Sequence, residues 1–480
     1  MKRLLATVVG AILFFPPMAN AEMFSNLKFS GSLDLQGNSA RNTQDFMTGA
    51  DGPVPANNND RVSDMITRTM VHADWDLLDD VHAKVTVRKN DRTWGPAAAG
   101  QAGAANTAAN PSGSQVIGAA GVMAAIYVDQ AYFTIDKVFG AVDMTLGRQF
   151  YGEPGDHIIY WGPRDDYGLT TTAIDAFVAD VGNDFVTFSG IAGKMIGSGQ
   201  LTTAADRDIR GFDVGMKGMP LKFNAYTYNR VQKSATTIGL GSAVGGANDN
   251  LWVYSIKLRG DGGGGWFNFD AAMNGGANRL VAPGGIATTG SYSGKMFAVD
   301  FGFNMDVPDV GGFTPWANFG WGSGNSNALE GENDGFTAIA SDFRPGIMNR
   351  RFDGQLVGLT EANGNAINTA SLNNRVVWGF GTKVTPAAAD QLTMGVSFWD
   401  FHFQRNTLNN AAFASNQGNK HIGYEYGLTA DWNHSENVKI GVGYARFHPG
   451  GYIREFNARG ASAQGHNPAV LTYADFSVKF

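Results

Sequence analysis

Residues 469–480 read AVLTYADFSVKF and alternate between two kinds of side chain. Phe476 and Val478 point to one side of an extended strand, whereas Asp475 and Lys479 point to the other, because successive side chains of a strand face opposite sides of the sheet. A chain that stops inside a strand leaves no tail to fray, so the final phenylalanine should be held within the structure. The stretch favours the closing strand of a barrel. The alternative is an edge strand of a soluble secreted β domain.

The first 21 residues have the features of a secretory signal peptide. Lys2 and Arg3 precede an apolar run from Leu4 to Phe15, and Ala19-Asn20-Ala21 offers a small-residue cleavage site. The apolar run is shorter than the about 20 residues that a membrane-spanning helix needs, and no longer apolar run follows it. We therefore expect an exported mature chain, residues 22–480, that forms a single domain without transmembrane helices.

The composition suits a β-barrel. The 480 residues contain no cysteine, which excludes disulfides and thiolate metal sites. The 64 glycines, 32 Phe, 14 Tyr and 10 Trp can supply the turns, loops and interfacial aromatic girdles of such a fold. A mean hydropathy of −0.17 is compatible with a membrane barrel, because only alternate residues of its strands face lipid. The net charge of −7 argues against nucleic acid as a partner.

Alternating segments recur along the chain and bring the expected strands to about 18, each near the roughly 10 residues that a tilted membrane strand requires. Short connections such as Leu78–Asp80 and Asp136–Ala141 alternate with long ones such as Gly152–Thr172 and Ser323–Asn373. This alternation is typical of outer-membrane barrels, which have short periplasmic turns and long extracellular loops. The sequence therefore predicts an all-β, transmembrane, antiparallel up-and-down β-barrel.

The polar faces of these strands should line an aqueous lumen. A sheet in lipid must close, since unpaired backbone groups find no water there, and an Arg or Lys that faces lipid at mid-depth costs about 2–4 kcal/mol. For each charged residue a solvated wall position is the alternative to a selectivity contact, and the mixed signs predict weak ion selectivity. Two of the candidates, Arg148 and Asp175, flank Gly152–Thr172 at the expected rim. The candidate pore-lining residues are Arg68, His72, Asp74, Lys84, Arg88, Arg148, Asp175, Lys257, Arg259, Asp300, Lys383 and Glu425.

Signals of catalysis are weak. The sequence contains no phosphate-binding loop, dinucleotide fingerprint, zinc-protease helix motif or nucleophile elbow. His157 shares one long segment with Asp165 and Asp166, an arrangement that could orient an imidazole for proton transfer or metal binding. A solvated histidine beside unrelated acids is the favoured interpretation. The acidic group at residues 330–334 lacks the spacing of a calcium-binding loop. We predict no catalytic, cofactor-binding or metal-ligating residues.

Two parts of the chain resemble known outer-membrane proteins. The alternation that ends in Phe480 resembles the C-terminal signature by which bacterial outer-membrane proteins are recognised for assembly. Leu146–Gln149, the loop with Gly162-Pro163-Arg164, and Ile174–Phe177 resemble the alginate-export-like and related porin families of Gram-negative bacteria. That resemblance implies a barrel of about 18 strands, and in the alginate exporters an arginine-lined bore that passes an acidic polysaccharide. This chain departs from them because no arginine soon follows Asp175.

The sequence thus predicts a porin of the bacterial outer membrane, a passive channel for small hydrophilic solutes or ions. Outer-membrane lipid should surround it, and it could associate as a homotrimer. One of the long segments Gly152–Thr172 and Ser323–Asn373 would fold inward as a constriction. Two further classes stay open: a binding or structural barrel that sheathes a partner protein, and an outer-membrane hydrolase with catalytic groups at its extracellular rim.

Overall fold

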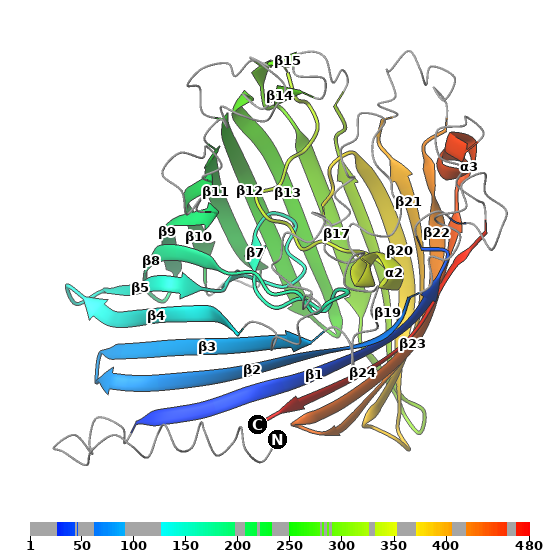
Figure 1. The fold of residues 1–480 in the computed structure, drawn as a ribbon, viewed down its shortest axis with the longest axis horizontal. Helices are drawn as coiled ribbons and strands as arrows, with labels where there is room; N and C mark the ends of the chain where they lie inside the picture. Colours follow the sequence, from blue (N-terminus) through cyan, green and yellow to red (C-terminus); the bar gives the residue numbers. More distant parts are fainter. Residues whose placement is uncertain are drawn as a thin grey trace, which may run out of the picture.

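The computed structural model describes residues 26–43, 46, 62–91, 126–196, 207–217, 221–232, 249–278, 281–282, 286–287, 290–325, 332–352, 371–405, 419–457 and 467–480. Within these residues the chain forms a closed, antiparallel barrel of 18 strands (Figure 1). The predicted fold class is therefore confirmed. The predicted signal peptide and its cleavage site lie outside the described residues. No helix in the described part of the chain is both long and apolar enough to cross a membrane.

Most strands belong to the barrel wall. In chain order the wall strands are β1 (Leu27–Arg41), β2 (Val62–Leu78), β3 (Val81–Asp91), β4 (Tyr127–Val138), β5 (Val142–Gln149), β8 (Ile174–Gly182), β9 (Val186–Ile196), β10 (Arg207–Met216), β11 (Leu221–Gln232), β12 (Asp249–Gly262), β13 (Gly265–Asn278), β17 (Lys295–Phe303), β19 (Gly311–Gly322), β20 (Arg375–Pro386), β21 (Leu392–Phe403), β22 (His421–Ser435), β23 (Val438–Pro449) and β24 (Ala469–Lys479). The shorter elements are β6 (Tyr151–Gly152), β7 (Tyr160–Trp161), β14 (Val281–Ala282), β15 (Ile286–Ala287), β16 (Gly290–Ser291), β18 (Met305–Val307), α2 (Ile347–Arg351) and α3 (Gly451–Asn457).

The first and last wall strands close the barrel. β1 pairs with β24 in an antiparallel register that runs from Ser32↔Lys479 to Arg41↔Val470. At the end of this register, Gly31 and Phe480 exchange two backbone hydrogen bonds of 2.7 and 3.0 Å. The stretch that the sequence singled out is therefore the closing strand, and Phe480 is held by the opposite end of the wall.

Connections at the two ends of the barrel differ in length. Hairpins at one end are tight: β2 passes to β3 through two residues, and β12 passes to β13 through Gly263 and Gly264. These two glycines have φ values of 60° and 85°, which a two-residue hairpin turn of type I′ requires and which other residues rarely adopt. The other end carries the long segments. The predicted short–long alternation is confirmed.

The outer face of the wall carries a belt of apolar side chains. Large side chains such as Val71, Phe301 and Leu428 are exposed there, while their neighbours in sequence point inward. Around the short-turn end runs a band of exposed aromatic residues, as expected for a girdle at the membrane interface. Its members are Phe29, Phe139, Phe185, Phe303, Trp432 and Phe480.

Two segments from the long-loop end turn into the barrel (Figure 1). Residues 151–172, which contain β6 and β7, form what we call the first inner loop, and residues 332–352, which contain α2, form the second inner loop. Ile158 of the first loop and Phe336 of the second are fully buried in one apolar cluster with Leu251 of the wall. Met348 of the second loop packs in another cluster with Ile453 of α3. The expected inward folding is thus observed, and both loops take part in it.

Closure should be sensitive to added volume at Gly31. A Cβ atom at this position would lie 2.6 Å from both the carbonyl oxygen of Met70 and the ring of Phe480. We expect Gly31→Ala to lower the free energy of unfolding by about 1–3 kcal/mol, the usual cost of overpacking. Urea unfolding of the barrel in lipid vesicles measures this free energy of unfolding. Gly262→Ala is the matched control, because its Cβ would meet no atom within 4 Å. Equal unfolding free energies for the two variants would contradict the prediction.

Candidate pore constriction

The two inner loops are joined by backbone hydrogen bonds. Ile159 and Ala340 form a parallel β-bridge. The N–H of Tyr160 donates to the carbonyl of Ala340 at 2.8 Å, and the N–H of Ala340 donates to the carbonyl of Ile158 at 2.9 Å. Segments that are far apart in sequence therefore form one unit inside the barrel.

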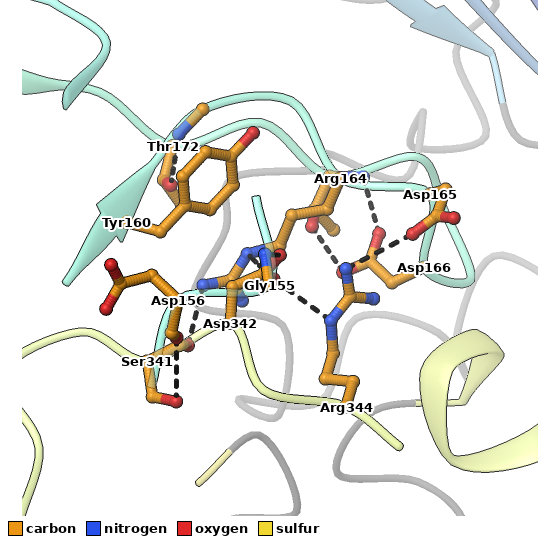
Figure 2. A network of polar contacts seen from close by, with 12 residues as sticks. Gly155, Asp156, Tyr160, Arg164, Asp165, Asp166, Thr172, Ser341, Asp342 and Arg344 are labelled. Atoms are coloured by element: carbon orange, nitrogen blue, oxygen red, sulfur yellow. Dashed lines mark hydrogen bonds and ion pairs between the residues drawn. The ribbon is translucent and has the colours of Figure 1, made fainter. Parts of the chain in front are cut away.

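Asp342 is at the centre of the polar contacts between the loops (Figure 2). Its carboxylate accepts a hydrogen bond from the N–H of Gly155 at 2.9 Å and pairs with Arg164 at 3.1 Å and with Arg344 at 3.0 Å. The guanidinium of Arg344 also reaches Asp165 at 3.2 Å. Asp342 and Arg344 are almost fully buried. Because a buried charge that loses its partner is strongly destabilising, this network holds the loops together.

Asp165 remains ionised at any pH near neutrality. Burial raises the pKa of its carboxyl group, but the charges of Arg350 and Arg344 outweigh that effect and lower the pKa to about 2. Arg350, which pairs with Asp165, keeps much of its side chain exposed to the lumen. The unit formed by the loops thus presents a pair of opposite charges to the cavity inside the barrel.

Strands β12 and β13 hold the first inner loop from one side. Lys257 forms a buried ion pair with Asp156, and its ammonium group lies 5.0 Å from the ring centre of Tyr226. Nδ1 of His157 is hydrogen-bonded to the carboxyl group of Asp270 at 2.6 Å, and both side chains are less than a tenth exposed. His157 is therefore a packed residue of the loop and not the solvated histidine that the sequence favoured.

Arg68 on β2 holds the first inner loop from the opposite side. Its guanidinium donates to the carbonyl oxygens of Arg164 at 2.7 Å and Leu169 at 3.3 Å. The same group pairs with Asp34 of β1 at 2.9 Å. Arg68 thus donates to buried loop carbonyls, and that of Leu169 also accepts from the side chain of Asn90 on β3. Buried carbonyls without a donor are costly.

The second inner loop is attached to the last strands. Glu425 of β22 is fully buried and accepts hydrogen bonds from the N–H groups of Ile347 and Met348 at the start of α2. These N–H groups have no partner within the helix, so the carboxylate acts as their cap. Arg351 at the end of α2 pairs with Asp475 of β24 at 2.6 Å. The candidate Glu425 therefore positions a loop.

A cavity of about 850 Å³ lies between the inner loops and the wall strands from both ends of the chain. Its lining is strongly charged, with the basic groups in excess. Among the described residues that line it, the basic ones are Arg68, Arg164, Arg344, Arg350, Arg351, Lys383 and Lys439, and the acidic ones are Asp34, Asp165, Asp342, Asp431 and Asp475.

Most of the predicted pore-lining residues lie on the inner face of the wall, opposite the exposed apolar side chains. Several are paired there: Asp74 with Lys84 at 2.9 Å, Arg88 with Asp129 at 2.6 Å, and His72 with Thr86 at 2.8 Å. Contact between a solute and any of them stays a prediction. The inner-face candidates are Arg68, His72, Asp74, Lys84, Arg88, Lys257, Arg259, Asp300, Lys383 and Glu425.

Arg148 and Asp175 depart from the prediction. They face each other across β5 and β8 and pair at 3.5 Å. Asp175 alternates with the buried Ile174 and Ala176 and shares a side with the exposed Phe177, which places it on the outer face. Arg148 is its partner in the register and lies on the same face. The sequence placed them at the rim of the pore from their position beside a long loop. Their side chains point away from the lumen.

The network between the inner loops was not predicted. Asp156, Asp342, Arg344 and Arg351 lie outside the alternating strands, so the rule that identified the wall residues did not reach them. A signal does exist in the sequence: residues 341–351, SDFRPGIMNRR, combine charged groups with bulky apolar ones inside a long connection. Such a composition predicts a segment that packs against the rest of the protein.

Comparisons with known proteins identify similar folds among solved structures but no similar sequences. No protein family and no curated protein sequence matches this chain. Among solved structures, Pseudomonas aeruginosa OccK9 (OpdG) matches with a TM-score of 0.52, 10% identity, and coverage of 94% of this chain and 99% of that one. Pseudomonas aeruginosa OccK8 (OprE) matches with a TM-score of 0.51 and 8% identity, over 95% of this chain and 99% of that one. Pseudomonas aeruginosa OpdK with vanillate matches with a TM-score of 0.50 and 9% identity, over 94% of this chain and 98% of that one.

These neighbours are outer-membrane porins, channels for small solutes. The chain therefore has the fold of an outer-membrane porin over almost its whole length, as the sequence predicted. The similarity lies in the fold, since few residues are identical.

Loss of Lys257 should loosen the first inner loop. Lys257→Met leaves the carboxylate of Asp156 buried without its cation, which typically costs about 3–5 kcal/mol. We expect amide hydrogen exchange at Ile158 and Ile159 to accelerate by about 100-fold or more, since each 1.4 kcal/mol is a factor of ten. Lys383→Met is the control, because Lys383 lines the cavity without an ion-pair partner among the described residues. Equal exchange rates in both variants would show that the ion pair does not hold the loop.

Proposed function

We propose that this protein is a porin of the bacterial outer membrane, through which small hydrophilic solutes and ions diffuse passively. The observation that carries the proposal is the pair of inner loops, which are anchored to the wall on several sides and leave a charged cavity of about 850 Å³. A barrel with about 18 strands encloses water, so these loops define the narrowest part of the path. Export by the signal peptide Met1–Ala21, the single domain at residues 22–480, and association as a homotrimer belong to the same proposal.

The charges of the cavity favour small anions. Basic side chains outnumber acidic ones in its lining, and Lys383 and Arg350 expose their charged groups to it. Charged groups at a constriction determine which ions enter. The OpdK structure was determined with vanillate, a small carboxylate, and a cavity of this size and charge suits solutes of that kind. The acidic groups among the lining residues keep the preference weak.

A polymer is the second candidate solute. The resemblance to the alginate-export-like family implies an acidic polysaccharide in an arginine-lined bore. Arg148 and Asp175 lie within the stretches that carry the resemblance, and their side chains point outward. That direction and the acidic groups in the cavity favour small solutes instead.

Two other classes have less support. A sheath for a partner protein needs a bore wide enough for that partner, whereas here the inner loops occupy the lumen. A hydrolase needs an acid, a base and a nucleophile within reach of one another. His157 is hydrogen-bonded to Asp270 and packs against the ring of Phe343, while Asp165 is paired with arginines. Neither arrangement leaves an acid–base pair directed at a substrate.

Removal of the second inner loop should widen the channel. Replacing the segment Ser323–Asn373 by a short Gly/Ser linker removes the groups that pin the first inner loop as well, because Asp342 and Arg344 are lost. We expect single-channel conductance in planar bilayers to rise severalfold. Shortening the connection at residues 279–289, which joins β13 to β16, is the control and should leave conductance unchanged. A conductance that does not change when the second inner loop is removed would contradict its role as a constriction.

Lys383 and Arg350 should govern the ion preference. We expect the double variant Lys383→Gln/Arg350→Gln to shift the reversal potential in a KCl gradient toward the potassium potential, because two exposed cations leave the constriction. Lys194→Gln removes a cation from the outer face, where Lys194 pairs with Asp208, and serves as the control. If both changes shift the reversal potential equally, the selectivity arises from the net charge of the protein and not from the cavity.

A further inference from the structure

Three side chains with metal-ligating atoms converge at the long-loop end of the barrel. Asp400 and His402 belong to β21 and His421 begins β22. In β21, Asp400 and His402 alternate with Phe401 and Phe403, which are buried inside the barrel. The side chains of Asp400 and His402 therefore point to the outer face. The cluster is therefore separate from the cavity and its loops.

Distances within the cluster fit ligands of a single ion. One oxygen of Asp400 lies 2.8 Å from Nε2 of His421 and 3.8 Å from Nδ1 of His402. The candidate ligand atoms of all three residues lie within 4.8 Å of one another. Ligands of a tetrahedral zinc ion are about 3.3 Å apart, as follows from bonds of about 2.0–2.1 Å. The contact between His402 and Asp400 is too long for a hydrogen bond, so hydrogen bonding alone does not account for the position of this imidazole.

We propose that Asp400, His402 and His421 bind a divalent transition-metal ion, with zinc as the best-suited example. Two imidazoles and one carboxylate suit zinc and its neighbours among the transition metals, whereas magnesium and calcium prefer oxygen ligands alone. Three protein ligands leave the fourth tetrahedral position to water. The site faces the medium at the rim, so an ion reaches it without passing through the pore.

The sheet itself prepares this arrangement. The register between β21 and β22 shifts after the pair Phe401↔Gly423, so that His402 pairs with His421 across the bulge. A bulge of this kind redirects side chains, and here it places two imidazoles side by side with ring centres 4.7 Å apart. Tyr424 stacks on His421 at 6.4 Å and 11° and so fixes the plane of that ring. The ligands are thus largely positioned before an ion arrives.

Metal binding would join the ends of two neighbouring strands. Residues 404–420 connect β21 to β22, and the ion would close this connection at its base. Sequence alone gives little sign of the site, because His402 and His421 are separated by that long connection and only the strand register brings them together.

Calorimetric titration tests the proposal on the complete, untagged barrel, extracted in detergent and freed of metal with a chelator. We expect zinc chloride to bind with one ion per chain. His402→Asn and His421→Asn should each weaken binding at least tenfold. His434→Asn, at the far end of β22, is the matched control and should bind as the unchanged protein does. No binding by the unchanged protein, or equal binding by all variants, overturns the proposal.

Diffraction provides a second measurement that does not depend on the folding of variants. Crystals of the unchanged protein soaked in zinc should give an anomalous peak about 2.0–2.2 Å from a nitrogen of His402, a nitrogen of His421 and an oxygen of Asp400. A peak only at another histidine, such as His82 between Asp76 and Asp136, overturns the assignment.

Discussion

The pairing of β1 with β24 is the interaction on which the rest of the structure depends. In lipid each backbone N–H and C=O group of the wall needs a partner, so the sheet is stable there only when its two ends meet. The register Ser32↔Lys479 to Arg41↔Val470 supplies those partners, and Phe480 extends it to Gly31. Closure gives every strand an inner and an outer face. The alternation of apolar and polar residues along each strand then determines which side chains face outward.

Closure creates a second demand, because a barrel of this width cannot be filled by the side chains of its own wall. The inner loops fill only part of the interior, and they bring backbone polar groups into a buried environment. Those groups need donors and acceptors from the wall. Arg68 serves loop carbonyls, while Glu425 serves the N–H groups of α2. Charged residues on the inner face thus have two roles. Some hold the loops, whereas Lys383 faces the cavity, as does the exposed Arg350 of the second inner loop.

The sequence predicted the wall better than the constriction. Period-two alternation is a local property, so the strands, their order and the direction of Asp74 or Lys84 follow from residues close together in the chain. The constriction depends on contacts between distant segments, such as Asp342 with Gly155, which no local pattern encodes. His157 was assigned to solvent for the same reason, because its partner Asp270 is in a strand far along the chain.

The case of Arg148 and Asp175 shows where the alternation rule ends. A charged side chain must face the lumen only at the depth of the hydrocarbon, and near the rim the outer face meets headgroups and water. There an outward pair such as Arg148–Asp175 or Lys194–Asp208 carries no large penalty. The outer face therefore has two chemical zones, an apolar belt and a polar rim. Asp400, His402 and His421 lie in the rim, and only there can a strand present two imidazoles and a carboxylate outward without burying them in lipid.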